Sequence, residues 1–219
     1  MAGARTHSLS SKGVFIALLF AAIAVSFIPI IHVPFRWLET YFHEMSHGLM
    51  AVFTGGQIVR IELNLDGSGL CTTRGGFRFL VAFAGYLGAS LFGALLYAMA
   101  DRIPKRHAGY LAFTLAGVIA VSAVLYGRDP ITWGIHAVLA LMFLGVARLR
   151  EAPIIRLSLK FAGLYVIVSA LQSPLVLLGY SGNNDAATLT SLTAIPSLFW
   201  IGIWVLSALA LLIWLFLEK

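Results

Sequence analysis

Long uninterrupted apolar stretches constrain this chain more than any other feature of its sequence. A helix needs roughly 20 residues to cross the hydrocarbon core of a bilayer. Stretches of about that length without a charged residue occur at 13–31, 79–100, 108–127, 161–180 and 195–216. Only 11% of the residues are charged, against about 25% in soluble domains. We therefore expect an integral, multi-pass membrane protein with the lipid bilayer as its main solvent.

The apolar pattern predicts an all-α polytopic fold of about seven transmembrane helices. We expect these helices at about 13–31, 36–54, 77–100, 107–127, 131–148, 157–179 and 195–217. The first is expected to be a retained helix, because its apolar run is long for a secretory signal and no cleavage pattern follows it. Residues 1–219 are interpreted as one membrane-embedded domain.

One segment departs from the helical pattern. Between the second and third predicted helices, apolar and polar side chains alternate from Val59 to Leu65, a period of two that is typical of a strand. The run Asp66–Gly69 then has turn-forming residues, and 70–74 can return as a second strand. We predict a β-hairpin over about 57–74, directly after the second helix.

The cysteine count and the net charge exclude some classes of site. Cys71 is the only cysteine, so neither an intrachain disulfide nor a cysteine-rich metal site is possible. The net charge of +6 comes mostly from short loops between apolar stretches, where basic residues commonly set topology. No nucleic-acid partner is predicted. On a seven-helix count, the basic residues lean towards an outside N-terminus.

The second predicted helix carries an unusual number of ionisable groups. Besides Arg36 at its start, the range 36–54 contains two glutamates and two histidines: Glu39, His43, Glu44 and His47. A charged side chain at the centre of a bilayer costs about 2.5–3.5 kcal/mol even on insertion scales. We therefore expect these groups to have partners or to face a polar cavity.

The spacing of three of these residues indicates a metal site. Residues four apart lie on one face of a helix, so His43 and His47 can offer two nitrogens to one Zn2+. Glu44 is then beside the open coordination position, where it can act as a general base. The alternative is a pair of buried histidines that pack helices, with Glu44 as a hydrogen-bonded partner.

The run Phe42–Gly48, on a membrane helix followed by a hairpin, resembles the site-2 protease family of intramembrane zinc metallopeptidases. Gly85-Tyr86-Leu87-Gly88 and Asn184-Asp185-Ala186 resemble the compact branch of that family, which has little beyond the membrane core. The resemblance implies that the two histidines bind zinc, the glutamate is the base and a distal aspartate is the third ligand. The sequence departs from better-known members in lacking an Asn-Pro-rich approach to a late Leu-Asp-Gly motif.

A catalytic zinc usually has three protein ligands, so one ligand remains to be assigned. With seven helices, Asp66, Asp129 and Asp185 lie on the side where the second helix ends. Asp66 is better explained by hairpin turn chemistry, and Asp129, before Pro130, by a turn or a helix start. We predict Asp185 as the third ligand, with the alternative that it is a helix N-cap.

The predicted function is hydrolysis of a peptide bond in a membrane-embedded protein or peptide substrate by a zinc metalloendopeptidase. A helical substrate must unwind before cleavage, and an exposed strand edge can hold an extended peptide. Ile61 and Leu63 are the predicted substrate-binding residues, although a plain connecting hairpin is an equal alternative. The alternative function is a metal-binding membrane protein without hydrolysis, either a transporter or an inactive regulator.

Overall fold

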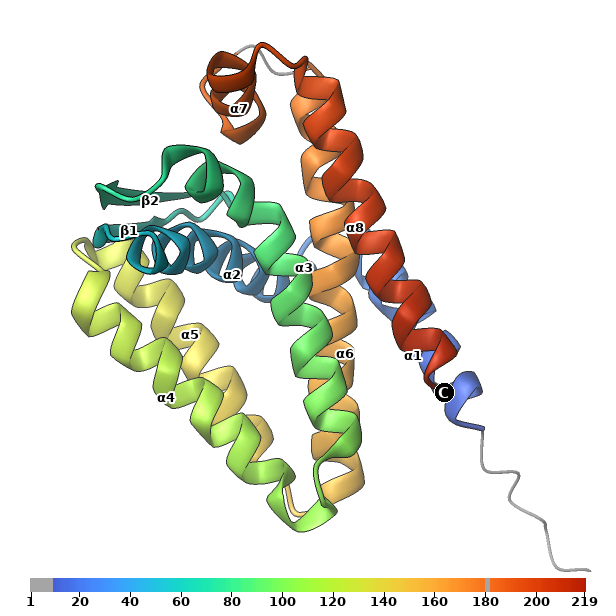
Figure 1. Ribbon diagram of the computed structural model, residues 1–219. Coiled ribbons are helices and arrows are strands. Elements are labelled where there is room, and N and C mark those ends of the chain that lie inside the picture. The colour runs from blue at the N-terminus through green and yellow to red at the C-terminus, as the bar shows by residue number, and fades with distance from the viewer. Residues whose placement is uncertain (1–9, 180–181) are drawn as a thin grey trace, which may run out of the picture.

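The computed structural model describes residues 10–179 and 182–219, and Figure 1 shows their arrangement. The first half contains α1 (Ser11–Ser26), α2 (His32–Phe53), β1 (Gln57–Leu63), β2 (Gly69–Arg74), α3 (Arg78–Arg102) and α4 (Ala108–Tyr126). The second half contains α5 (Pro130–Ala147), α6 (Ala152–Gln172), α7 (Asp185–Thr193) and α8 (Ser197–Leu217). Short 3₁₀ helices precede α4 and follow α6, at Lys105–His107 and Ser173–Gly179.

Five helices of the described chain are long and apolar enough to cross a membrane. They are α3, α4 with its preceding 3₁₀ helix, α5, α6 with its following 3₁₀ helix, and α8. Each predicted helix has a counterpart, but the count of about seven spans is not confirmed. The apolar helix α1 has only 16 residues, and α2 carries too many ionisable side chains to qualify.

The direction of α2 differs from that of the long helices. In Figure 1, α2 runs across α3 and α6, beneath the hairpin, whereas α3, α6 and α8 run along the long direction of the molecule. The hydroxyl of Ser11 donates to the carbonyl of Lys219 at 3.0 Å, so the start of α1 and the end of α8 lie together. Seven crossings would instead place these two ends on opposite sides of the membrane. The expectation of an outside N-terminus, which depended on seven crossings, therefore loses its basis.

Small residues set the spacing at the centre of the helical layer. A Cβ added to Gly93 of α3 would lie 2.8 Å from the carbonyl oxygen of Gly163 in α6, and one added to Gly163 would lie 2.6 Å from that of Gly93. Such glycine pairs let two membrane helices approach at backbone distance. The α4–α5 pair packs on one side of this centre, and α8 packs on the other (Figure 1).

The predicted hairpin is present as an antiparallel pair with Leu63 opposite Gly69 and Ile61 opposite Cys71. Asp66 closes its turn, because its Oδ1 accepts hydrogen bonds from the amide and hydroxyl of Ser68 at 2.9 and 2.7 Å. These bonds hold the pKa of Asp66 below its usual value. The Thr40 hydroxyl of α2 donates to the carbonyl of Gly67 at 2.7 Å, which fixes the turn against α2.

Candidate metal centre

The middle of α2 brings its two predicted histidine ligands to one point. His43 and His47 lie one turn apart, and their Nε2 atoms are 3.0 Å from each other. Both side chains are largely buried, with 12% and 10% exposed. Two ring nitrogens this close to each other can share either a proton or a bound cation.

Asp185 reaches the same point from a different part of the chain. It is the first residue of α7, and its Oδ2 lies 3.1 Å from His43 Nε2 and 3.2 Å from His47 Nε2. The N-cap of α7 is Asn184, whose side chain accepts the amide of Ala187 at 2.9 Å. Asp185 is therefore not the cap, and its carboxylate is directed at the histidines.

The three atoms form a nearly equilateral triangle whose size suits zinc. Zinc binds histidine nitrogen and carboxylate oxygen at about 2.0–2.2 Å, and a tetrahedron of that size has edges of roughly 3.3–3.5 Å. The observed edges of 3.0, 3.1 and 3.2 Å are slightly shorter. His43, His47 and Asp185 are the group of possible metal ligands found among the described residues. Two nitrogens and one carboxylate leave a fourth position open, as in catalytic zinc sites.

The outer contacts of His47 prepare it to bind a metal. Its Nδ1 lies 2.6 Å from the carbonyl oxygen of Val81 in α3. Because a carbonyl can only accept, Nδ1 carries the proton and Nε2 keeps its lone pair for a ligand. Gly85 makes this approach possible, since an added Cβ would lie 2.6 Å from His47 Nε2 and from His43 Cε1. Gly88 and Gly93 approach Ser46 and α6 instead.

Glu44 lies directly under the hairpin. It is 5% exposed, and a Cβ added to Gly69 of β2 would lie 2.7 Å from its Oε1. Glu44 and the three predicted ligands line one cavity of about 480 Å³, bounded by α2, β2, α3 and α7. The predicted base and the predicted ligands thus share one space large enough for part of a substrate.

The two rival aspartates have local roles. Asp66 closes the hairpin turn, as described above. Asp129 is the N-cap of α5 and accepts the amide of Thr132 at 2.8 Å; its hydrogen bonds with Thr132 hold its pKa below the usual value. Neither carboxylate belongs to the His43–His47–Asp185 group.

The placement of Ile61 and Leu63 corrects their predicted role as substrate contacts. Both side chains belong to the core, with 0% and 1% exposed, and neither lines the cavity. The amide of Leu63 donates a hydrogen bond to the Thr132 hydroxyl at 2.9 Å. An amphipathic strand buries its apolar face, so the apolar residues of β1 face the core. The strand beside the cavity is β2.

Glu39 has no role in the site predicted from the sequence, but the structure places it beside that site. This side chain lines the cavity, is 4% exposed and lies one turn before His43. Its Oε2 accepts hydrogen bonds from Ser169 and Ser173, both at 3.3 Å. The four-residue spacing from Glu39 to His43 indicates that both side chains lie on the same face of α2. The two serines, about 130 residues downstream, gave no signal in the sequence.

Comparison with known proteins identifies a family. The family described as Peptidase M50B-like matches residues 15–215, almost the whole chain. The matched range includes α2, the hairpin and α7, and so all the residues of the cavity described above. No curated protein and no solved structure matches the chain.

Proposed function

Because this chain belongs to the Peptidase M50B-like family, and with it to the site-2 protease family of multi-pass membrane proteins, we propose that it is an intramembrane zinc metalloendopeptidase. Its substrate is a membrane-embedded protein or peptide. One observation carries the proposal: His43 Nε2, His47 Nε2 and Asp185 Oδ2 lie 3.0–3.2 Å apart in the cavity that Glu44 lines.

The proposed ligands, the proposed base and two of their neighbours have distinct parts in the proposed reaction. His43, His47 and Asp185 hold the zinc, which when bound polarises a scissile carbonyl and makes water more acidic. Glu44 accepts the proton of the attacking water and passes it to the leaving amine. Val81 holds the His47 ring in the tautomer that binds metal. Glu39 positions α2, because its hydrogen bonds with Ser169 and Ser173 join this helix to α6.

The edge of β2 is the proposed binding surface for the unwound substrate. Along an antiparallel ladder, pairs of opposite residues alternate between two kinds. In one kind, the N–H and C=O groups of both residues point at the partner strand, and in the next kind they point away from it. Leu63 donates its amide away from β2, to Thr132, so its partner Gly69 directs its own groups away from β1. Cys71, two residues on, does the same. Gly69 and Cys71 line the cavity, where an extended peptide can pair with them.

The experiment that tests the function is a Glu44→Gln substitution. We expect this variant to keep its zinc, because Glu44 is not among the three ligands, and to lose about 10²–10⁴-fold in cleavage rate. The probe is a single-span peptide, labelled with a fluorophore and a quencher at its two ends, reconstituted with the protein in liposomes. Equal cleavage by the variant and the wild type would exclude Glu44 as the base, and zinc-loaded wild type without cleavage would support the non-hydrolytic alternative, a transporter or an inactive regulator.

A Gly69→Val substitution tests the proposed strand edge. The added side chain meets the Glu44 carboxylate and pushes β2 away from the cavity, so cleavage should fall by about tenfold or more while zinc content stays unchanged. Thr73→Val is the matched control, because Thr73 lies on the same strand and does not line the cavity. Normal cleavage by a folded Gly69→Val variant would exclude β2 as the substrate edge.

A further inference from the structure

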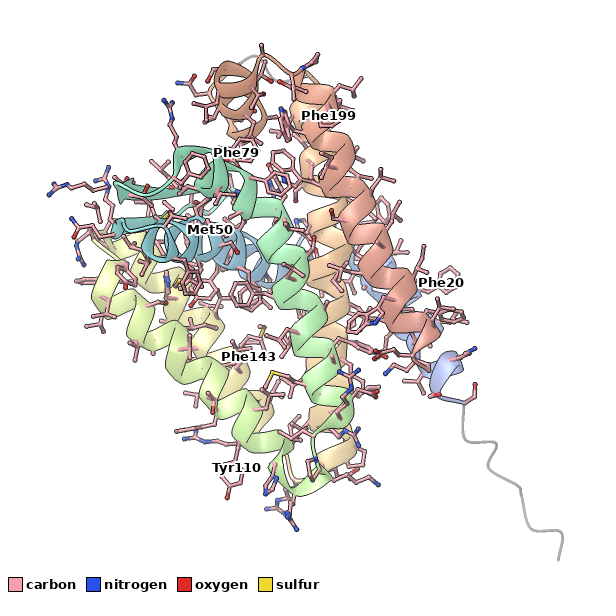
Figure 2. The ribbon with its side chains drawn as sticks, viewed as in Figure 1. Phe20, Met50, Phe79, Tyr110, Phe143 and Phe199 are labelled. Atoms are coloured by element: carbon pink, nitrogen blue, oxygen red, sulfur yellow. The ribbon has the colours of Figure 1, made fainter. Side chains whose placement is uncertain are left out.

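A second cavity lies far from the metal centre, among the ends of α4, α5 and α6. It has a volume of about 620 Å³. Four basic residues line it: Lys105 and Arg106 from the turn before α4, and Arg148 and Arg150 from the loop between α5 and α6. Figure 2 shows Tyr110, which also lines this cavity, at the opposite end of the molecule from Phe199 and α7.

These four cations differ from the others at the same end of the molecule. Lys160 and Lys219 form ion pairs with Asp101, and Arg102 forms one with Glu218. Within residues 10–179 and 182–219, no carboxylate lies within ion-pair distance of Lys105, Arg106, Arg148 or Arg150. The cavity therefore has a surplus of positive charge that the described chain does not neutralise.

The remaining wall of the cavity is apolar. Phe113 and Tyr110 of α4 are 61% and 69% exposed, and Leu144 and Ile155 line the opposite side. A small inorganic anion would contact the cations and leave these rings and aliphatic side chains unused. The combination suits a ligand that has an anionic head and an apolar tail.

The position of the cavity also suits such a ligand. Loops that join membrane helices lie at the level of the lipid headgroups, and basic cavities between helix ends at this level bind anionic headgroups. The basic residues Arg102, Arg156, Lys160 and Lys219 gather around the end of α3, next to the turn that contains Lys105 and Arg106. An excess of Lys and Arg favours the cytoplasmic side, whose leaflet contains anionic lipids.

We propose that this cavity binds one anionic phospholipid. Lys105, Arg106, Arg148 and Arg150 contact its phosphate, and an acyl chain lies along Phe113 and Leu144. This binding site is separate from the metal centre and does not depend on hydrolysis.

Native mass spectrometry of the full chain with added lipid tests the proposal. We expect wild-type protein to retain one molecule of dioleoylphosphatidylglycerol in preference to dioleoylphosphatidylcholine. The double substitution Arg148→Gln, Arg150→Gln should weaken phosphatidylglycerol binding by about 10- to 30-fold, since each basic residue near a headgroup contributes to its binding. The matched control is Arg60→Gln, Arg74→Gln, which removes the same charge from the hairpin and should bind the lipid as wild type does.

Three results would overturn the proposal. Equal retention of the two lipids would exclude recognition of an anionic head. An equal loss of phosphatidylglycerol binding in the hairpin control would show that binding depends on net charge and not on this cavity. Displacement of phosphatidylglycerol by millimolar inorganic phosphate alone would show a simple anion site in which the apolar wall has no part.

Discussion

Helices α2 and α5 both bury histidine in an apolar protein, and they do so in different ways. From Pro130 to Ala147, α5 has a single ionisable side chain, His136, and it is long and apolar enough to span. By contrast, α2 carries Glu39, His43, Glu44 and His47 in its buried face and lies across the spanning helices (Figure 1). The polar groups of α2 are tolerable because other elements supply partners for them.

His136 makes its one hydrogen bond within its own helix. Its Nδ1 donates to the carbonyl of Thr132, one turn earlier, at 2.8 Å, and its ring meets the ring of Tyr41 edge-on at 5.4 Å. No carboxylate or second imidazole converges on it among the described residues. The paired histidines of α2 instead converge on Asp185. The convergent set of α2 and α7 can hold a cation, whereas His136 has one backbone acceptor and a buried Nε2 without a partner among the described residues.

The largest predicted effect contrasts these two kinds of histidine. The zinc content of the double variant His43→Ala, His47→Ala should fall from about one zinc per chain to background, since two of the three ligands are removed. Peptide cleavage should be lost with it. His136→Ala should keep its zinc. The measurement is metal content of purified protein by atomic emission, with gel filtration to confirm folding. Zinc retained by the double variant, or lost from a folded His136→Ala variant, would break the distinction between α2 and α5.

A slightly smaller effect is expected for the ligand supplied by α7. Asp185→Ala should weaken zinc binding by more than the roughly 10- to 100-fold that loss of an outer-shell partner causes. Asp66→Ala and Asp129→Ala should bind zinc normally, because these carboxylates accept hydrogen bonds from Ser68 and Thr132. Competition with a fluorescent chelator measures the affinities. The assignment fails if Asp66→Ala loses zinc while Asp185→Ala retains it.

Two glycines give the smallest and most closely matched comparison. Gly85→Ala adds a methyl group 2.6 Å from His47 Nε2, so zinc affinity should fall by about 10- to 100-fold. At Gly134 of α5 nothing lies within 4 Å of an added Cβ, and Gly134→Ala should stabilise the helix by about 0.5–1 kcal/mol without changing zinc affinity. Thermal unfolding and the chelator assay report the two effects. Equal zinc affinity in both variants would show that α3 does not crowd the histidines.

The same contrast explains how much of the molecule the sequence could predict. Charge-free length identifies α3, α4, α6 and α8, because lipid requires it. Helical spacing brings His43, Glu44 and His47 together, because this geometry is local to one helix. Asp185 was predicted by excluding Asp66 and Asp129, whose turn and cap chemistry is also local.

Features that depend on packing between distant segments could not be predicted. The angle at which α2 crosses α3 depends on packing and cannot be predicted from the sequence. The predicted count of seven spans therefore includes α2. Alternation along β1 showed that one face is buried, but not that the core lies on the side of Ile61 and Leu63. The nine-residue α7 enters the prediction only through the alternative that Asp185 is a helix N-cap, because so short a helix has little periodic signal. Its cap at Asn184 decides where Asp185 points.

The most direct test of the metal centre is zinc K-edge X-ray absorption of the purified, zinc-loaded wild-type protein. The geometry of His43, His47 and Asp185 predicts only nitrogen and oxygen ligands, at about 2.0–2.2 Å, with outer-shell scattering from two imidazole rings. Cys71 lines the same cavity and is the one cysteine of the chain. A sulfur ligand at about 2.3 Å, or scattering from fewer than two imidazoles, would contradict the proposed site.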